Sequence, residues 1–319
     1  MPGVPPTRFV YLGPESTFTE QALLTIPAAA RGTRTPARSV PEALDAVREG
    51  DADAALVPME NSIGGQVGVT LDELLTGEPL MITREVVIPV EFVLATRAGT
   101  KLADVTAVAA HPQASTQCRG WLRSHVPDAT VVDVLSNAAA AQAAASGAVD
   151  AAICAPIAVQ RYRLSLLADK IADHPDAVTR FALLSRPGPP PAPTGDDITS
   201  LAVSIAHDRV GALLAVLTEL AVRGVNLIRI ESRPTGEQLG RYAFFLDCTG
   251  HVAEARLGEA LQGLRRVCAA VRFLGSYPRA VPPGSIPDRP VAPPAGLSDA
   301  DFADSVAWLA ALRSGTQGA

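Results

Sequence analysis

Residues 130–154 read TVVDVLSNAAAAQAAASGAVDAAIC and contain a complete strand–helix–strand unit. Thr130–Val134 is rich in β-branched residues, which favours a strand. Ser136 can cap the alanine-rich helix that follows, and Gly147 can end it. Ala151–Cys154 is a short apolar segment of the kind that forms a buried strand. The unit therefore predicts two strands joined by a helix, the building block of a parallel sheet.

The same alternation continues toward the amino terminus. Helices are expected from Ser39 to Gly50 and from about Ser115 to His125, and further strands at 9–12, 54–57, 85–94 and 105–110. Within 85–94, Pro89 is expected to form a bend or to lie at a sheet edge. Strands that alternate with helices predict α/β architecture, with parallel sheets covered by helices on both faces. In such sheets ligands bind beyond the carboxyl ends of the strands.

The pattern changes after the proline-rich segment 186–197, which neither a helix nor a central strand can cross. Strands are expected at 199–205, 225–232, 241–247 and 271–275, and helices at 211–223 and 253–269. The first of these helices has one apolar face, formed by Leu213, Leu214, Leu217 and Leu220. The order βαββαβ predicts a ferredoxin-like domain.

A second proline-rich segment contains Pro282, Pro283, Pro287, Pro290, Pro293 and Pro294. After it, Ser298 and Asp301 have the spacing of a capping box, and Phe302, Val306, Leu309 and Leu312 recur at helical spacing. We expect a short amphipathic tail helix that docks loosely on its own protein rather than a dedicated partner motif.

Length and composition limit the class of protein. The chain has 319 residues and 48% hydrophobic residues, which is enough for two packed domains. A net charge of -6 and only 4% aromatic residues exclude a general nucleic-acid binder. The four cysteines form no CxxC pair, so they are expected as buried thiols and not as zinc ligands. The sequence has no apolar stretch of signal-peptide or membrane-span length, which predicts a reducing, cytoplasmic setting.

Four polar clusters of the first domain follow predicted strands or precede predicted helices. Their candidate ligand-binding residues are Ser16, Thr17 and Thr19; Glu60, Asn61 and Ser62; His111, Gln113, Ser115, Thr116 and Gln117; and Thr179 and Arg180. Each cluster taken alone is also compatible with ordinary capping or structural hydrogen bonding. No metal-ligand set, phosphate loop or dinucleotide fingerprint accompanies them. Neutral donors with one or two arginines suit a small dianion and the departure of a leaving group.

Six segments of the chain, four in the first domain and two in the second, together carry a family resemblance. Residues 11–20, 57–67, 111–118 and 179–181 resemble prephenate dehydratase, in the order found in that family. Residues 211–213 and 230–234 resemble its regulatory ACT domain, which binds phenylalanine. The resemblance covers about residues 8–278.

The resemblance implies a two-lobed, periplasmic-binding-protein-like catalytic domain over 8–186. Its lobes would be 8–83 plus 175–186, and 84–174, followed by an ACT domain at 198–278 and a tail at 281–319. The implied reaction converts prephenate to phenylpyruvate, water and CO2 without a metal or other cofactor, under allosteric inhibition by phenylalanine. The implied partners are these two small molecules and further copies of the chain, as a dimer or tetramer, and neither nucleic acid nor membrane.

The implied site residues fall into three groups. The catalytic group is Thr179, Arg180, Glu60, Asn61, Ser62, His111, Gln113 and Gln117, and the further substrate-binding group is Thr17, Thr19, Ser115 and Phe181. The phenylalanine site is expected at Gly211, Ala212, Leu213, Asn226, Leu227, Glu231, Ser232, Arg233 and Pro234. Ser16, Val178 and Ala110 depart from the family pattern, so no role is transferred to them.

The chemistry leaves alternatives open. Thr179 is a weak acid, so the final proton donor is either His111 or Glu60. Arogenate dehydratase, whose substrate carries an amino acid side arm, fits the same residues. A non-catalytic cytosolic sensor of small anions is the alternative from another class, and it would have no need of Thr179.

Overall fold

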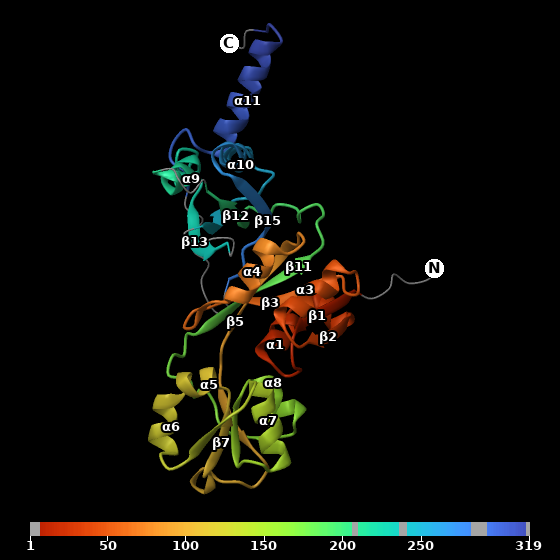
Figure 1. The fold of residues 1–319 in the computed structure, drawn as a ribbon, viewed down its shortest axis with the longest axis vertical. Helices are drawn as coiled ribbons and strands as arrows, with labels where there is room; N and C mark the ends of the chain where they lie inside the picture. Colours follow the sequence, from red (N-terminus) through yellow and green to blue (C-terminus); the bar gives the residue numbers. More distant parts are fainter. Residues whose placement is uncertain (1–6, 206–209, 236–240, 282–291, 317–319) are drawn as a thin grey trace, which may run out of the picture. The chain divides into compact units, whose positions relative to one another are not determined.

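A computed structural model describes residues 7–205, 210–235, 241–281 and 292–316 (Figure 1). The described chain divides into two compact units. The first unit holds the residues up to 70 and residues 86–183. The second holds 71–85 and, within the described ranges, 184–281 and the tail.

The first sheet has the strand order β2-β1-β3-β11-β5, with the short β4 beside β3. β1 pairs in parallel with β2 and β3, whereas β4 is antiparallel to β3. The strands are β1 (Arg8–Leu12), β2 (Thr33–Ala37), β3 (Ala54–Asn61), β4 (Gly65–Gln66), β5 (Met81–Pro89) and β11 (Val178–Ser185). The accompanying helices are α1 (Phe18–Leu24), α2 (Pro27–Arg31), α3 (Val40–Arg48) and α4 (Gly68–Thr76). Tyr11, Leu23, Leu56 and Phe181 are among the side chains of its core.

The second sheet has the order β10-β6-β9-β7-β8. Its strands are β6 (Val93–Thr96), β7 (Ala107–Ala110), β8 (Thr130–Asp133), β9 (Ala151–Cys154) and β10 (Ser165–Ala168). A 3₁₀ turn (Leu102–Asp104) precedes β7, and the helices are α5 (Pro112–Gln117), α6 (Arg119–His125), α7 (Asn137–Ser146) and α8 (Pro156–Arg161). The strand–helix–strand unit at 130–154 is present as β8, α7 and β9, with Ser136 capping the helix and Gly147 ending it. β8 and β9 are not neighbours, because β7 lies between them and pairs in parallel with both.

Two expectations for this region are wrong, the parallel sheets and the single helix at 115–125. The sheets are mixed rather than parallel, since β6 runs antiparallel to both β9 and β10. The break expected at Pro89 is confirmed: the segment 85–94 is divided into β5 and β6, because Pro89 has no N–H to continue the ladder. The helix expected from Ser115 to His125 is two helices, which meet at Cys118, whose backbone angles are not helical.

The ferredoxin-like prediction is confirmed in the second unit. Its elements are β12 (Asp197–Ser204), α9 (Ala212–Ala221), β13 (Leu227–Pro234), β14 (Tyr242–Thr249), α10 (Ala255–Val267) and β15 (Ala270–Pro278). The antiparallel sheet has the order β13-β14-β12-β15. Val216 and Leu220 are the buried residues of α9, whereas Leu214, expected on its apolar face, is exposed.

The tail helix α11 (Asp299–Arg313) begins with the predicted capping box of Ser298 and Asp301. Most of its predicted apolar face is exposed within the described residues: Val306, Leu309 and Leu312 are 61%, 40% and 44% exposed. The helix is joined to α10 where the Arg256 N–H donates to Asp299 Oδ1. The prolines from Pro282 to Pro290 lie outside the described residues.

The four cysteines are free and buried, as expected. Burial raises the pKa of Cys118, Cys154 and Cys248 to about 12, so these thiols behave as small apolar side chains. In the described ranges, no helix is both long and apolar enough to cross a membrane.

Candidate active site

The candidate site is a pocket in the first unit with a volume of about 280 Å³. It is lined by residues of α1, β3, α5, α7, β11 and three connecting segments: Phe18, Pro58, Asn61, Val67, Val90, Phe92, His111, Gln113, Ala114, Gln117, Asn137 and Thr179. The volume is near the lower limit for small-ligand pockets, roughly 300 Å³. Five of the predicted site residues therefore meet here: Asn61, His111, Gln113, Gln117 and Thr179.

Thr179 is oriented by Asn61 on the neighbouring strand. The Asn61 Nδ2 donates to Thr179 Oγ1 at 2.8 Å. The other amide atom, Oδ1, accepts from the N–H groups of Ile63 and Gly64, at 2.9 and 2.8 Å. Because these two N–H groups require an acceptor, the orientation of the amide is determined. The Thr179 hydroxyl therefore accepts from Asn61 and keeps its own proton for a ligand.

Glu60 and Arg180 form a second pair across the same two strands. Arg180 Nε lies 3.4 Å from Glu60 Oε2. Side chains alternate between the two faces of a strand, so this pair lies on the face opposite Asn61 and Thr179. Neither residue lines the pocket. Ser62 exchanges hydrogen bonds with the backbone of Val178, and so joins the end of β3 to the start of β11.

His111 and Gln113 extend the polar wall from α5. The Gln113 N–H donates to His111 Nδ1 at 3.3 Å, so a neutral His111 ring has its proton on Nε2. The Gln113 side chain lies against the loop after β3, because a methyl group at Gly64 would lie 2.8 Å from Gln113 Nε2. A side chain at position 64 would therefore displace the Gln113 amide from the loop after β3.

Sequence reasoning missed the apolar wall and one amide. Phe18 and Phe92 pack edge to face, with ring centroids 5.3 Å apart. The buried Oδ1 of Asn137 has no hydrogen-bond partner among the described residues, so it is a candidate acceptor for a ligand hydroxyl. Asn137 directly follows the predicted cap Ser136, but nothing in the sequence distinguishes it from an ordinary first residue of a helix.

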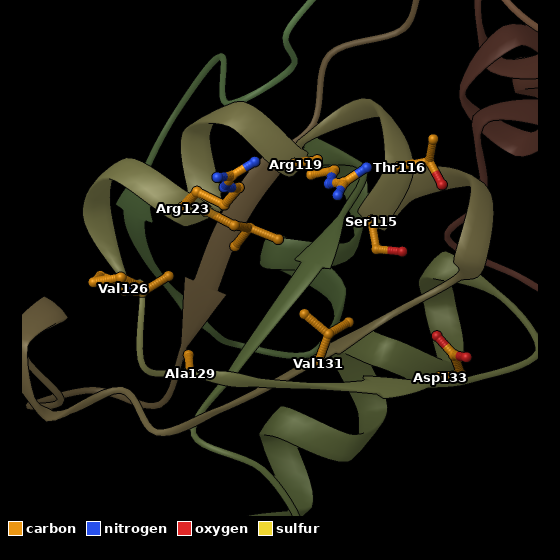
Figure 2. A pocket seen from close by; sticks show the side chains of 10 residues that line it. Ser115, Thr116, Arg119, Arg123, Val126, Ala129, Val131 and Asp133 are labelled. Atoms are coloured by element: carbon orange, nitrogen blue, oxygen red, sulfur yellow. The ribbon is translucent and has the colours of Figure 1, made fainter.

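Four predicted substrate-binding residues do not line the pocket. Thr17 caps α1 by accepting from the Glu20 N–H, and Thr19 is buried in the same helix. Phe181 belongs to the core of the first sheet. Ser115 and its neighbour Thr116 line a different hollow of about 410 Å³, where Arg119 and Arg123 of α6 face Val131 and Asp133 of β8 (Figure 2).

The predicted effector residues lie on two segments of the ferredoxin-like domain, the start of α9 and strand β13 with the residue before it. Gly211 caps α9, which begins with Ala212 and Leu213. Asn226 precedes β13, which contains Leu227, Glu231, Ser232, Arg233 and Pro234. β13 is the outermost strand of its sheet, and Ile228 and Ile230 are each 43% exposed on it. Among the described residues no strand pairs with its outer edge, so this strand presents both an unpaired edge and apolar side chains.

The site of the first unit has a defined chemical character. Among the described residues that line it, none is acidic and none is arginine or lysine. No group of three or more His, Cys, Asp or Glu side chains in the described ranges could hold a metal ion. Hydroxyl, amide and imidazole groups around an aromatic wall define a pocket for a small ring-containing ligand with polar substituents, of the kind found in α/β enzymes.

Comparison with known proteins identifies the family. The profile of "Prephenate dehydratase" matches residues 9–189, and that of "ACT domain" matches 199–266. The chain is 47% identical to a prephenate dehydratase of Amycolatopsis methanolica over 98% of this chain and 99% of the relative. It is 48% identical to one of Mycolicibacterium vanbaalenii, covering 99% of each chain.

A solved structure agrees with these relatives. The prephenate dehydratase of Arthrobacter aurescens, determined in complex with L-Phe, superposes with a TM-score of 0.88 at 46% identity, covering 96% of this chain and 99% of that one. This chain belongs to the prephenate dehydratase family, with a catalytic domain followed by an ACT domain. It is therefore a carbon–oxygen lyase of the phenylalanine pathway.

Proposed function

We propose that the pocket binds prephenate and that Thr179 donates a hydrogen bond to the departing C4 hydroxyl. The bond between C1 and its carboxylate breaks, and its electron pair enters the ring as CO2 is released. The C4–O bond breaks as the oxygen gains a proton and leaves as water. Since the ring becomes aromatic, the enzyme needs only to hold the carboxylates and supply that proton.

The 2.8 Å contact between Asn61 and Thr179 carries this proposal. It leaves the Thr179 proton available and fixes its direction before substrate binds, as electrostatic catalysis requires. Because Thr179 is a weak acid, it relays the proton, and a protonated His111 supplies it and is left as a neutral imidazole. His111 lines the pocket, whereas Glu60 is paired with Arg180 on the other face of the sheet.

The lining also favours prephenate over arogenate. Arogenate carries an ammonium group, and burying it calls for a carboxylate partner. The described residues around the pocket include no acidic side chain. The amides of Gln113, Gln117 and Asn137 provide neutral donors that suit the carboxylates of prephenate.

Turnover of the purified full-length chain on prephenate and on arogenate tests this function. We expect conversion of prephenate to phenylpyruvate, with a much lower kcat/KM for arogenate. Thr179→Val should lower kcat by about 10²-fold or more while KM changes little, because the hydroxyl acts mainly in the transition state. Thr116→Val, on the neighbouring hollow, is the matched control and should keep full activity. A Thr179→Val variant that keeps its activity would contradict the proposal. A wild-type enzyme that turns over neither prephenate nor arogenate would contradict it as well.

Phenylalanine is the proposed effector, bound at Gly211–Leu213 and Asn226–Pro234 between the ferredoxin-like domains of two chains. Three observations support this site: the relative solved with L-Phe, the unpaired edge of β13, and the exposed Ile228 and Ile230 on that strand. The proposed assembly is a dimer or tetramer, which light scattering of the full-length protein measures directly. A monomer that binds phenylalanine would contradict the shared site.

The proposed location is the cytoplasm. Four free, buried thiols suit a reducing compartment, where no disulfide is needed for stability. Cell fractionation tests this, and recovery in a membrane or secreted fraction would contradict it.

A further inference from the structure

Helix α4 is one of the segments through which the chain passes between the two units. It begins at Gly68 and ends at Thr76, and the unit boundary falls between Thr70 and Leu71. At 1.5 Å per residue the helix is roughly 13 Å long. Its first turn therefore belongs to the unit that holds the pocket, and its last turns belong to the unit that holds the ferredoxin-like domain.

The first turn of α4 is hydrogen-bonded to the pocket wall. The Thr70 hydroxyl donates to the Pro58 carbonyl at 2.7 Å, and Pro58 lines the pocket. Val67, directly before the helix, also lines the pocket, and its N–H donates to the Met59 carbonyl at 2.9 Å. A displacement of this turn must therefore move pocket-lining residues.

Two arginines of the ferredoxin-like sheet hold the rest of the helix. Arg233 of β13 donates from Nη2 to both carboxylate oxygens of Asp72, each at 2.7 Å, and from Nε to Oδ1 at 3.1 Å. Arg272 of β15 donates from Nη1 to the carbonyls of Leu74 and Gly77, at 2.9 and 2.7 Å. These last carbonyls of a helix lack helical partners, so a cation there stabilises the helix end.

Strand β5 also crosses the boundary between the two units, between Glu85 and Val86, and its first residues contact the ferredoxin-like sheet. A methyl group at Gly275 of β15 would lie 2.2 Å from the Ile82 carbonyl oxygen, so the two strands are in direct backbone contact. The Ala280 N–H donates to Glu85 at 3.2 Å. β5 then continues into the first unit and is followed at once by the pocket residue Val90.

We infer that α4 transmits the binding of phenylalanine to the catalytic pocket, and that Arg233 acts by positioning α4 through Asp72. The inference rests on the proposed function, because it assumes an effector on β13. Binding that displaces β13 changes the Arg233–Asp72 contact, and α4 passes the change to Pro58 and Val67. Inhibition then arises because phenylalanine favours one position of α4 and prephenate another.

The variant that tests this is Asp72→Asn, because Asp72 lies outside both the pocket and the proposed effector site. We expect kcat and KM without phenylalanine, and the phenylalanine Kd without substrate, to stay within about threefold of the wild type. The factor by which saturating phenylalanine lowers kcat/KM should fall about fivefold or more, within the usual range of allosteric coupling. Titration calorimetry and steady-state kinetics on the full chain give these quantities.

Asp45→Asn is the matched control. It removes an ion pair of similar length, 2.8 Å from Asp45 to Arg48, on a helix of the first unit. Inhibition of this variant should equal that of the wild type. Asp72→Glu restores the carboxylate and should restore part of the lost coupling. Arg272→Leu, which releases the end of α4 without touching Arg233, should also weaken coupling.

The outcomes separate the inference from the function on which it rests. An Asp72→Asn enzyme that binds phenylalanine and is inhibited as strongly as the wild type overturns the role of α4, while turnover and effector binding by the wild type stand. A wild-type chain that does not bind phenylalanine overturns the proposed regulation and the inference together. Loss of coupling in Asp45→Asn as well would show a general loss of rigidity and would overturn the specific role of Asp72.

Discussion

The pocket of the first unit and the outer strand of the second are built in opposite ways. In the pocket, polar groups are already held by the protein: Asn61 orients Thr179, and backbone N–H groups orient Asn61. On β13, Ile228 and Ile230 are exposed and one edge of the strand is unpaired. The difference fits the two proposed tasks, because catalysis needs groups fixed before substrate arrives, whereas the proposed effector site is completed by a second chain.

Removing the Asn61 side chain, which orients Thr179 in the pocket, should have the largest effect, a loss of catalytic rate. Asn61→Ala takes away the donor to Thr179 and the acceptor for two N–H groups, so we expect kcat to fall about 10²-fold. The Asn61→Ala/Thr179→Val double variant should be little worse than either single variant, because the two residues act as a unit. Full additivity in steady-state kinetics would contradict the proposed preorganisation.

A steric change in the second unit should lower stability rather than activity. Gly275 has φ +138 and lies against Ile82, so Gly275→Ala introduces both strain and a backbone clash. We expect a loss of about 3 kcal/mol in the free energy of unfolding, measured in urea. Gly258→Ala is the matched control, since Gly258 lies in helix α10, where a methyl group has room, and it should be neutral or stabilising.

A charge on the outer strand should disrupt assembly and regulation while leaving catalysis intact. Ile230→Glu places a carboxylate on the exposed apolar surface of β13, and we expect the concentration of phenylalanine for half inhibition to rise about tenfold. Light scattering should show a smaller assembly in the same sample. Leu312→Glu, at an apolar position of the tail helix that is 44% exposed against 43% for Ile230, is the control. Unchanged assembly in Ile230→Glu would place the interface elsewhere.

The smallest effect is expected on stability, at Asp150, whose carboxylate accepts hydrogen bonds at the start of β7 in the second sheet. Hydrogen bonds from the Thr106 backbone and side chain, and from Ala107, lower the pKa of Asp150. A carboxyl with a lowered folded-state pKa contributes stability above its unfolded pKa and loses it as the pH falls through the folded value. Asp150→Asn should therefore cost about 1 kcal/mol at pH 7, and the difference from the wild type should shrink below about pH 4.

The exposed Asp128→Asn serves as the control for that pH dependence, because Asp128 accepts no hydrogen bond within the described ranges. Thermal melts of both variants and the wild type between pH 3 and pH 7 give the comparison. A difference between Asp150→Asn and the wild type that stays constant across this range would show that the hydrogen bonds do not favour the charged carboxyl.

Much of the local structure followed from the sequence. Ser136 and Gly147 bound α7, Ser298 and Asp301 cap α11, and the βαββαβ order of the second unit was predicted. Sequence reasoning missed β2, β10 and β11. β2 contains Pro36 and lies at a sheet edge, while the start of β11 holds the polar Thr179 and Arg180, so neither has the apolar pattern of a buried strand.

The sequence by itself determined the candidate site residues and the helices and strands on which most of them lie, because capping, periodicity and turn chemistry act over a few residues. Only the tertiary structure decided their partners. Thr179 and Asn61 face the pocket while Arg180 and Glu60 pair behind it, through the register of β3 and β11. Arg233 meets Asp72 across 161 residues of chain. Such contacts depend on how distant strands pair and pack, and no local pattern specifies them.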